Sequence, residues 1–167
     1  FAGALDLYAA LRKAGEKLGV VDAGYRAIES CRLEKGYRYW SGDLTPDYTP
    51  YDAGLGFCVR LDKADFIGKE ALTKAKAAGP RWKLCTFTMD GFVPLFGGET
   101  ILREGQVLGV LTAGGYGHTL RQAIAFGYLP PAEAVHADFE IEAFGARYPA
   151  TKGPDVLFDP KRTRILV

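Results

Sequence analysis

The sequence predicts an α+β chain in which a part built of helices and loops, residues 1–79, precedes a small antiparallel β-barrel or jelly-roll, residues 80–167. Three observations support this fold class. Apolar residues recur at helical spacing near the start of the chain. The run Ala78-Gly79-Pro80 is the clearest break in the pattern. After this break, short apolar runs alternate with turns that contain Gly or Pro, which is typical of small all-β domains.

Two helices are expected before residue 36. The first is amphipathic and ends at Gly19, and its apolar side consists of Leu5, Tyr8, Leu11 and Leu18. The second covers Ala23–Lys35 and ends at Gly36, which tolerates the left-handed conformation common after a helix. Its apolar positions at helical spacing are Ala27, Ile28 and Cys31.

A loop rich in aromatic residues follows the second helix. Pro46 and Pro50 keep it out of helix and central strand, and its rings are Tyr37, Tyr39, Trp40, Tyr48 and Tyr51. We expect a strand at Leu55–Leu61 and then a helix that runs to about Ala77, with Asp65 as its N-cap. Such a loop suits a flat, partly polar heterocycle, although the same rings could simply pack the loop onto the protein.

The second part of the chain is expected to form strands joined by short turns. Glu104-Gly105 is a two-residue hairpin turn, Gly145-Ala146 a second one, and Pro130-Pro131 a break. We interpret residues 114–118 as a flexible loop. The expected strands are Trp82–Met89, Glu99–Arg103, Gln106–Thr112, Gln122–Leu129, Phe139–Phe144 and Arg147–Thr151, with Asp155–Leu166 finishing the chain.

Composition and charge exclude several classes of function. A net charge of +1 provides no field that would attract nucleic acid or an anionic membrane, so neither is expected as a partner. No apolar run approaches the roughly 20 residues that span a bilayer, and no secretory signal is recognised at the start. The three cysteines form no CxxC pair, so we expect no metal site but reduced, buried thiols in a cytosolic-type compartment: Cys31, Cys58 and Cys85.

Several motifs together resemble a known family. RLEKGYRYWSGD followed by TPYDAGLGF is similar to the aminomethyltransferase (glycine-cleavage T-protein) superfamily, and KADFIGKEAL at Lys63–Leu72 is typical of its dimethylglycine and sarcosine dehydrogenase branch. The later run GGETILREGQVLGVLTAGGYGHTLRQAIAFGYLP resembles the C-terminal barrel of the same enzymes. The resemblance implies that residues 1–79 end an α/β folate-binding domain and that residues 80–167 form its C-terminal barrel.

The resemblance also implies three residues that bind the cofactor tetrahydrofolate. Arg32 matches the family arginine of the RLE motif, and ligand contact is favoured over an ion pair with Glu29 or Glu34. Phe57 stands where the family has a Trp or Tyr in the folate pocket, so only the stacking part of that role is kept. Trp40 is expected to be a further wall residue. The catalytic aspartate of the family is expected upstream of Phe1, so no catalytic residue is assigned here.

Other polar residues are interpreted more modestly. We expect Glu34 to fix Arg32 or Arg38, and Asp43 to cap the Asp-Leu-Thr-Pro turn, rather than to act as an acid–base pair. His118 could be a general base, but a lone histidine in a loop is more often simply solvated.

The resemblance therefore implies part of a tetrahydrofolate-dependent unit that captures a one-carbon group from an N-methylated glycine as 5,10-methylenetetrahydrofolate. Phe1 leads straight into a helix, so we expect a longer parent chain with an upstream oxidase domain that binds FAD, and little activity from these residues alone. The expected location is the cytoplasm, or the mitochondrial matrix in a eukaryote. Two alternatives remain: a glycine-cleavage T-protein with a lipoyl-carrier partner, and a scaffold module without catalysis.

Overall fold

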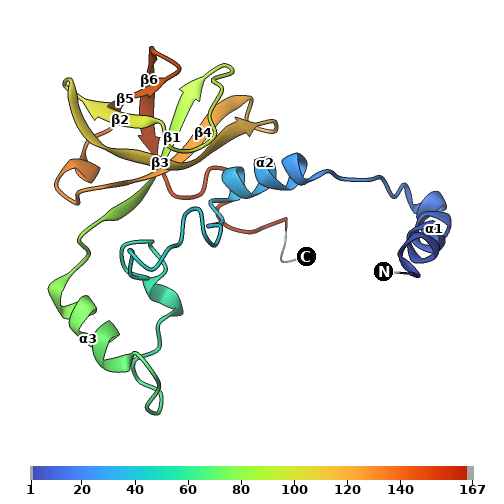
Figure 1. Cartoon of the computed structure of the whole chain (residues 1–167), viewed down its shortest axis with the longest axis horizontal. Coiled ribbons are helices and arrows are strands. Elements are labelled where there is room, and N and C mark those ends of the chain that lie inside the picture. Colours follow the sequence, from blue (N-terminus) through green and yellow to red (C-terminus); the bar gives the residue numbers. More distant parts are fainter. Residues whose placement is uncertain (1, 165–167) are drawn as a thin grey trace.

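A computed structural model of the chain describes residues 2–164. Helices and loops make up the chain before β1, and strands predominate after it, as Figure 1 shows. The helices and 3-10 turns are α1 (Ala4–Gly15), η1 (Glu16–Leu18), α2 (Tyr25–Lys35), η2 (Gly56–Cys58), α3 (Lys69–Ala78) and η3 (Glu133–Val135). The strands are β1 (Lys83–Asp90), β2 (Thr100–Arg103), β3 (Gln106–Gly117), β4 (Gln122–Leu129), β5 (Asp138–Ala143) and β6 (Ala146–Gly153).

The six strands form a closed antiparallel barrel in the order β1-β4-β3-β2-β5-β6. Closure comes from the pairing of Thr86–Thr88 in β1 with residues of β6. Glu104 and Gly105 form the tip of the β2–β3 hairpin with positive φ, and Phe144 and Gly145 do the same between β5 and β6. The expected small antiparallel barrel is confirmed, and the second hairpin turn lies one residue earlier than expected.

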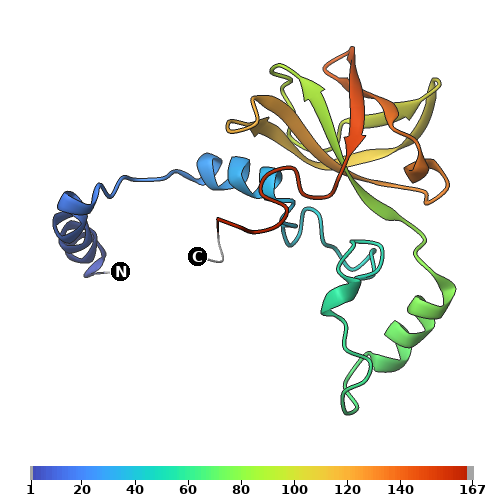
Figure 2. The same cartoon turned by 180° about the vertical axis from the view of Figure 1, so that it is seen from behind.

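The barrel is apolar on both faces along β1 and β4. Alternate residues of a strand point to opposite faces, and here one set of side chains joins the main core while the other joins a second cluster. Phe87 and Ala125 belong to the first, whereas Leu84, Ile124 and Phe126 belong to the second. The second cluster also contains Leu33 of α2, so the helix and the loop after it cover the outer face of these strands (Figure 2).

Helix α2 packs on the barrel through its last two turns. Its buried residues are Ser30, Leu33 and Glu34, while Ala27, Ile28 and Cys31, the expected apolar positions, are exposed. Apolar spacing alone predicted the wrong side, because two of the three buried residues are polar and their hydrogen bonds with β3 and the β3–β4 turn favour burial. Gly36 ends the helix in the left-handed conformation, as expected.

Helix α1 lies away from the barrel at the end of an extended segment (Figure 1). The apolar side of α1 and the following turn η1 is exposed: Leu5 and Leu18 each keep 82% of their surface, and Tyr8 and Leu11 keep 51% and 61%. The amphipathic pattern therefore predicted the helix correctly, but α1 ends at Gly15, earlier than expected, and Gly19 instead caps the 3-10 turn η1 in the left-handed conformation. The apolar side stays largely exposed.

Three expected elements differ from the structure. Leu55–Leu61 is not a strand: η2 occupies Gly56–Cys58, because Gly54 adopts a positive φ and the backbone turns back on itself. Asp65 does not cap α3, which begins after Gly68 with φ of 91° and has no side-chain cap. Residues 114–117 are not a loop but the end of β3, where they pair with β4.

The cysteines divide into two groups. Cys85 is buried as expected, and burial raises the pKa of its thiol to about 11. Cys31 and Cys58 are exposed, so the expectation of burial was wrong for these two. Across residues 2–164 no helix combines the length and apolar character needed to cross a membrane, and no group of three metal-ligating side chains gathers there. The domain boundary at Gly79 stays a prediction.

Candidate functional site

The segment Tyr37–Leu44, called here the aromatic loop, separates two cavities beside α2. One, the Phe57 hollow, has a volume of about 400 Å³; the other, the Arg32 cleft, has about 330 Å³. Tyr37, Arg38 and Leu44 face the hollow, whereas Tyr39 and Gly42 face the cleft. The loop is thus a shared wall, and its two sides carry different residues.

The Phe57 hollow combines exposed rings with cationic side chains. Phe57 is 74% exposed and Tyr37 is 51% exposed. Lys35 forms an ion pair with Asp159 at 3.3 Å, and Arg38 forms one with Asp155 at 3.6 Å. The rest of the lining consists of Gly36, Leu44, Gly54, Leu55, Val156 and Arg162.

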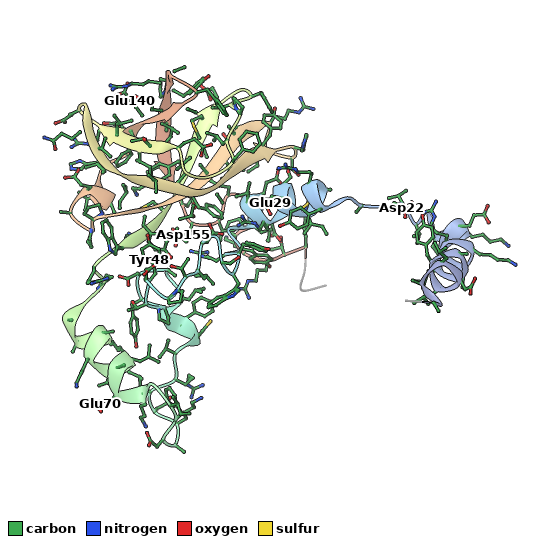
Figure 3. The ribbon with its side chains drawn as sticks, viewed as in Figure 1. Asp22, Glu29, Tyr48, Glu70, Glu140 and Asp155 are labelled. Carbon is green, nitrogen blue, oxygen red and sulfur yellow. The ribbon has the colours of Figure 1, made fainter. Side chains whose placement is uncertain are left out.

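The C-terminal segment, which is far from α2 in the sequence, contributes Asp155, Val156 and Arg162 to the lining of the Phe57 hollow. The amides of Leu157 and Phe158 donate to the carbonyl oxygen of Glu34, which fixes the segment beneath α2. Figure 3 shows Asp155 and Tyr48 at the junction between the barrel and the loops. The contributions of Asp155 and Arg162 were not predictable from the sequence, because no local pattern signals a contact between residues more than 100 positions apart.

Arg32 lines the cleft, but its guanidinium is occupied by groups of the protein. Nη1 donates to Asp43 at 2.7 Å and to the carbonyl of Tyr37 at 3.0 Å, and Nη2 donates to Glu29 at 2.5 Å. Only Nε is buried without a partner. Burial would lower the pKa of Arg32, but the hydrogen bonds and charges of Glu29 and Asp43 outweigh it and raise the pKa above its ordinary value. The guanidinium is therefore permanently charged and positioned by two carboxylates.

Asp43 is fully buried and connects three elements. One carboxylate oxygen accepts from Arg32 and from the amide of Tyr39 at 2.8 Å, and the other accepts from Thr112 Oγ1 of β3 at 2.5 Å. Its carbonyl accepts from Tyr128 Oη of β4 at 2.8 Å. These bonds lead to α2, the loop and the barrel, so the expected role of capping the Asp-Leu-Thr-Pro turn was wrong.

Tyr128 is itself held by stacking. Its ring lies 3.6 Å from that of Tyr48 with an interplanar angle of 7°. Burial, and then the nearby hydroxyl and carboxylates, raise the pKa of Tyr128 well above its ordinary value. The hydroxyl therefore stays protonated and remains a donor to the Asp43 carbonyl.

The three predicted folate residues are dispersed around the aromatic loop. Arg32 lines the cleft and Phe57 the hollow, so the two side chains expected to bind one cofactor line separate cavities. Phe57 lies on η2 rather than on a strand. Trp40 is 69% exposed and lines neither cavity. Contact of any of the three with folate stays a prediction.

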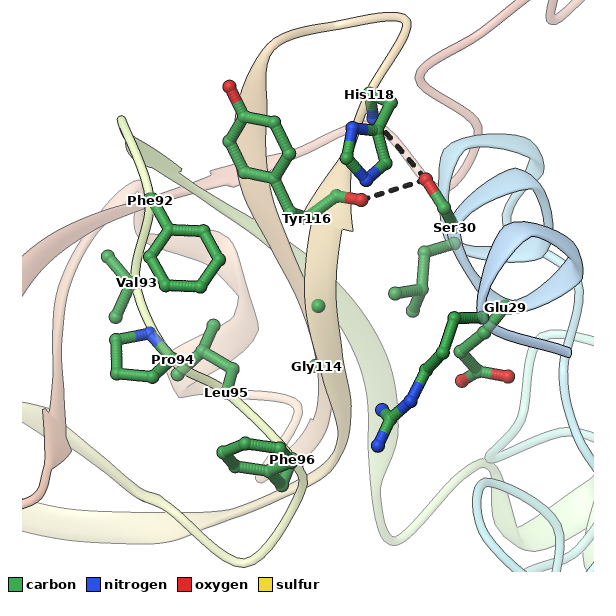
Figure 4. Close-up of a pocket in the computed structure, with 13 residues that line it drawn as sticks. Glu29, Ser30, Phe92, Val93, Pro94, Leu95, Phe96, Gly114, Tyr116 and His118 are labelled. Carbon is green, nitrogen blue, oxygen red and sulfur yellow. Dashed lines mark hydrogen bonds between the residues drawn. The ribbon is translucent and has the colours of Figure 1, made fainter. Parts of the chain in front are cut away.

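A third cavity, about 180 Å³, lies between α2 and the segment Phe92–Phe96 (Figure 4). Ser30 Oγ donates to the carbonyl of Tyr116 at 2.8 Å and accepts from the amide of His118 at 3.3 Å, which attaches the helix to β3. The His118 ring is exposed and packs edge-on against Tyr116 at 5.1 Å. These contacts join α2 to the end of β3 and have a structural role.

The sequence suggested that Glu34 would fix Arg32 or Arg38, but in the structure its carboxylate binds neither. Its Oε1 accepts from the amides of Thr119 at 2.7 Å and Leu120 at 3.2 Å, at the turn between β3 and β4. The carboxylate is 3% exposed. Backbone donors in place of a cation therefore satisfy this buried charge.

A closed antiparallel barrel with a helix and an aromatic loop docked on its outer face defines the chain as an α+β protein. The sequence profile of the GCVT N-terminal domain matches residues 2–63, and that of the glycine cleavage T-protein C-terminal barrel domain matches residues 83–159. The chain therefore belongs to the aminomethyltransferase (glycine-cleavage T-protein) superfamily.

Individual relatives agree with this assignment. Mitochondrial sarcosine dehydrogenase of Homo sapiens is 41% identical over 98% of this chain, and mitochondrial dimethylglycine dehydrogenase of Mus musculus is 38% identical over 95%. The crystal structure of glycine cleavage system aminomethyltransferase T from Bartonella henselae superposes with a TM-score of 0.77 at 31% identity, over 89% of this chain and 44% of that one. The chain spans only 19% of the length of the two dehydrogenases.

Proposed function

We propose that this chain forms one wall of a tetrahydrofolate site in a flavoenzyme related to dimethylglycine and sarcosine dehydrogenases. The whole protein would oxidise an N-methylated glycine in an upstream FAD domain and capture the one-carbon unit as 5,10-methylenetetrahydrofolate. The identity of 41% with sarcosine dehydrogenase over 98% of the chain supports this branch of the family.

The observation that carries the proposal is the composition of the Phe57 hollow. Folate combines a flat heterocycle with glutamate carboxylates, so its site needs aromatic faces and cations. The hollow offers the exposed rings of Phe57 and Tyr37 beside the cationic groups of Lys35, Arg38 and Arg162. The fit is chemical: ring faces for the heterocycle and cationic groups for the acidic end.

When bound, tetrahydrofolate supplies the nitrogens that accept the one-carbon unit. The residues of this chain position tetrahydrofolate and exclude water from its heterocycle. Positioning and water exclusion are the means by which such a site accelerates the reaction. Phe57 would stack on a ring, and Trp40, at the tip of the aromatic loop, would extend the wall. Arg32 is retained as a third contact through Nη2, which carries two N–H groups and donates to Glu29 with one of them, whereas Nε is buried.

Calorimetric titration of the full parent protein with tetrahydrofolate tests this proposal. Removal of the ring in Phe57→Ala is expected to weaken binding about tenfold, the effect of losing roughly 1.4 kcal/mol of stacking and burial. Phe144→Ala is the control, because Phe144 is similarly exposed, 78% against 74%, but lies at the β5–β6 hairpin. Equal affinity in wild type and Phe57→Ala would remove Phe57 from the site.

The alternative of a glycine-cleavage T-protein is supported by the structural similarity to aminomethyltransferase T. It would require a lipoyl-carrier protein as aminomethyl donor. Activity of the parent protein with an aminomethylated lipoyl carrier, and none with methylated glycines, would favour this alternative. A parent protein that binds no tetrahydrofolate at all would instead indicate a scaffold module.

A further inference from the structure

The aromatic loop lacks regular backbone pairing of its own. Its backbone bonds are short-range: Tyr37 donates to the carbonyl of Arg32 at the end of α2, Ser41 to that of Leu44, and Asp43 and Leu44 to that of Tyr39. Ser41 adopts a φ of 70°, in the left-handed region that a residue with a side chain rarely occupies. A turn of this kind holds its local shape, but its position relative to the barrel has to come from another contact.

Asp43 provides that contact. Its side chain is 0% exposed, and its bonds reach Arg32 on α2 at 2.7 Å and Thr112 on β3 at 2.5 Å. Since Tyr128 of β4 donates to the Asp43 carbonyl, the backbone of this residue is attached to the barrel as well as its side chain. Movement of the loop would leave a buried carboxylate and its donors unpaired, which is strongly unfavourable.

The attachment lies directly behind the wall of the Phe57 hollow. Leu44, the next residue, lines the hollow, and so do Tyr37 and Arg38 at the other end of the loop. The carbonyl of Tyr37 accepts from the same Arg32 Nη1 that donates to Asp43. One guanidinium and one carboxylate therefore fix both ends of the loop.

We propose that Asp43 is a positioning residue for the tetrahydrofolate site: its buried carboxylate, bonded to Arg32 and Thr112, fixes the wall of the Phe57 hollow without touching the ligand. This inference rests on the proposed function, because it assumes that the hollow is where folate binds. Small displacements of a binding wall cost affinity even when every lining residue is retained.

The test uses the full parent protein and two graded changes. Asp43→Asn keeps the size of the side chain but removes its charge, and Thr112→Val removes one donor with little change in shape. Thr112→Ser is the matched rescue variant, because it keeps the hydroxyl. Ile141→Val, in the fully buried centre of β5, is the control for a general loss of stability.

Two measurements are made on each variant: calorimetric affinity for tetrahydrofolate, and fluorine NMR after labelling with fluorotryptophan. The Trp40 signal is identified as the one that disappears in Trp40→Phe. We expect about tenfold weaker binding in Asp43→Asn and Thr112→Val, with a shifted or broadened Trp40 signal. In Thr112→Ser and Ile141→Val, the affinity for tetrahydrofolate and the Trp40 signal should both stay close to those of wild type.

The outcomes separate this inference from the proposed function. Wild-type affinity together with an unchanged Trp40 signal in Asp43→Asn and Thr112→Val would overturn the positioning role and leave the folate site intact. If wild type itself does not bind tetrahydrofolate, the proposed function fails, and with it the role of Asp43 at a folate site. A Trp40 signal that still shifts in Thr112→Val would then show only that Asp43 positions the loop.

Discussion

Replacement of Glu34 is the sharpest test of how α2 is attached to the barrel. Its carboxylate accepts the amides of Thr119 and Leu120 at the β3–β4 turn and is 3% exposed. Glu34→Met fills a similar volume but offers no comparable acceptor. Glu34→Gln keeps one carbonyl oxygen and is the matched control. The two variants therefore differ mainly in whether the turn amides keep a partner.

The size of the effect follows from the two hydrogen bonds. Bonds to a charged acceptor contribute about 1.5–3 kcal/mol each. Thr119 is exposed and Leu120 half-buried, so water can replace part of the loss. We therefore expect about 2 kcal/mol of local destabilisation in Glu34→Met and about half of that in Glu34→Gln.

Hydrogen exchange of the full protein, followed by mass spectrometry on peptides covering residues 117–121, measures this locally. Two kcal/mol corresponds to about 30-fold faster exchange at the two amides. A peptide from β5 in the same digest is the internal reference and should not change. Unchanged exchange of the turn in Glu34→Met would refute the conclusion that this carboxylate holds the barrel against α2.

Three further outcomes are expected. Gly117→Ala should lower the thermal midpoint, since a Cβ there would lie 2.5 Å from Ile124 Cδ1, while Gly24→Ala, with nothing within 4 Å, should not. Burial opposes ionisation of Asp52, but hydrogen bonds from Trp82 and Thr49 lower the pKa of its carboxyl below 3.8. Asp52→Asn should therefore reduce the free energy of unfolding at pH 7, and the loss measured in urea titrations should shrink as the pH falls below about 4. Iodoacetamide in the native state should label the two exposed cysteines but not Cys85, and early labelling of Cys85 would contradict its burial.

The barrel was predictable because its signals are local. Hairpin turns at Glu104-Gly105 and Phe144-Gly145 need residues that tolerate positive φ, and the sequence places glycine at both. Pro130 follows directly after β4, where a break was expected. Short strands between such turns restrict the chain to few antiparallel arrangements.

The errors arose where tertiary contacts outweigh local preference. Gly114 and Gly115 suggest a flexible loop, yet they extend β3 because they pair with Ala125 and Ile124 of β4. Leu33 of α2 packs so closely there that a Cβ on Gly115 would lie 3.0 Å from its Cδ1. Leu55–Leu61 has the composition of a strand, but it finds no partner strand and turns at η2 instead. The periodicity of a short segment does not show which distant part of the chain will pack against it or pair with it.

The candidate site was predictable only in part, for a related reason. Arg32 and Phe57 were identified from motifs, but the burial of Asp43 depends on Thr112 and Tyr128, which lie far away in sequence. An aspartate before Leu-Thr-Pro is typical of a turn cap. Only the folded chain reveals it as the anchor of a loop.

The most direct measurement of the central claim is the fate of the one-carbon unit in the parent protein. With an N-methylated glycine and tetrahydrofolate present, we expect mostly 5,10-methylenetetrahydrofolate from wild type and Phe144→Ala, and a shift towards free formaldehyde from Phe57→Ala. Formaldehyde release that is the same in all three proteins, with or without tetrahydrofolate, would contradict the claim that this chain helps to form a folate site.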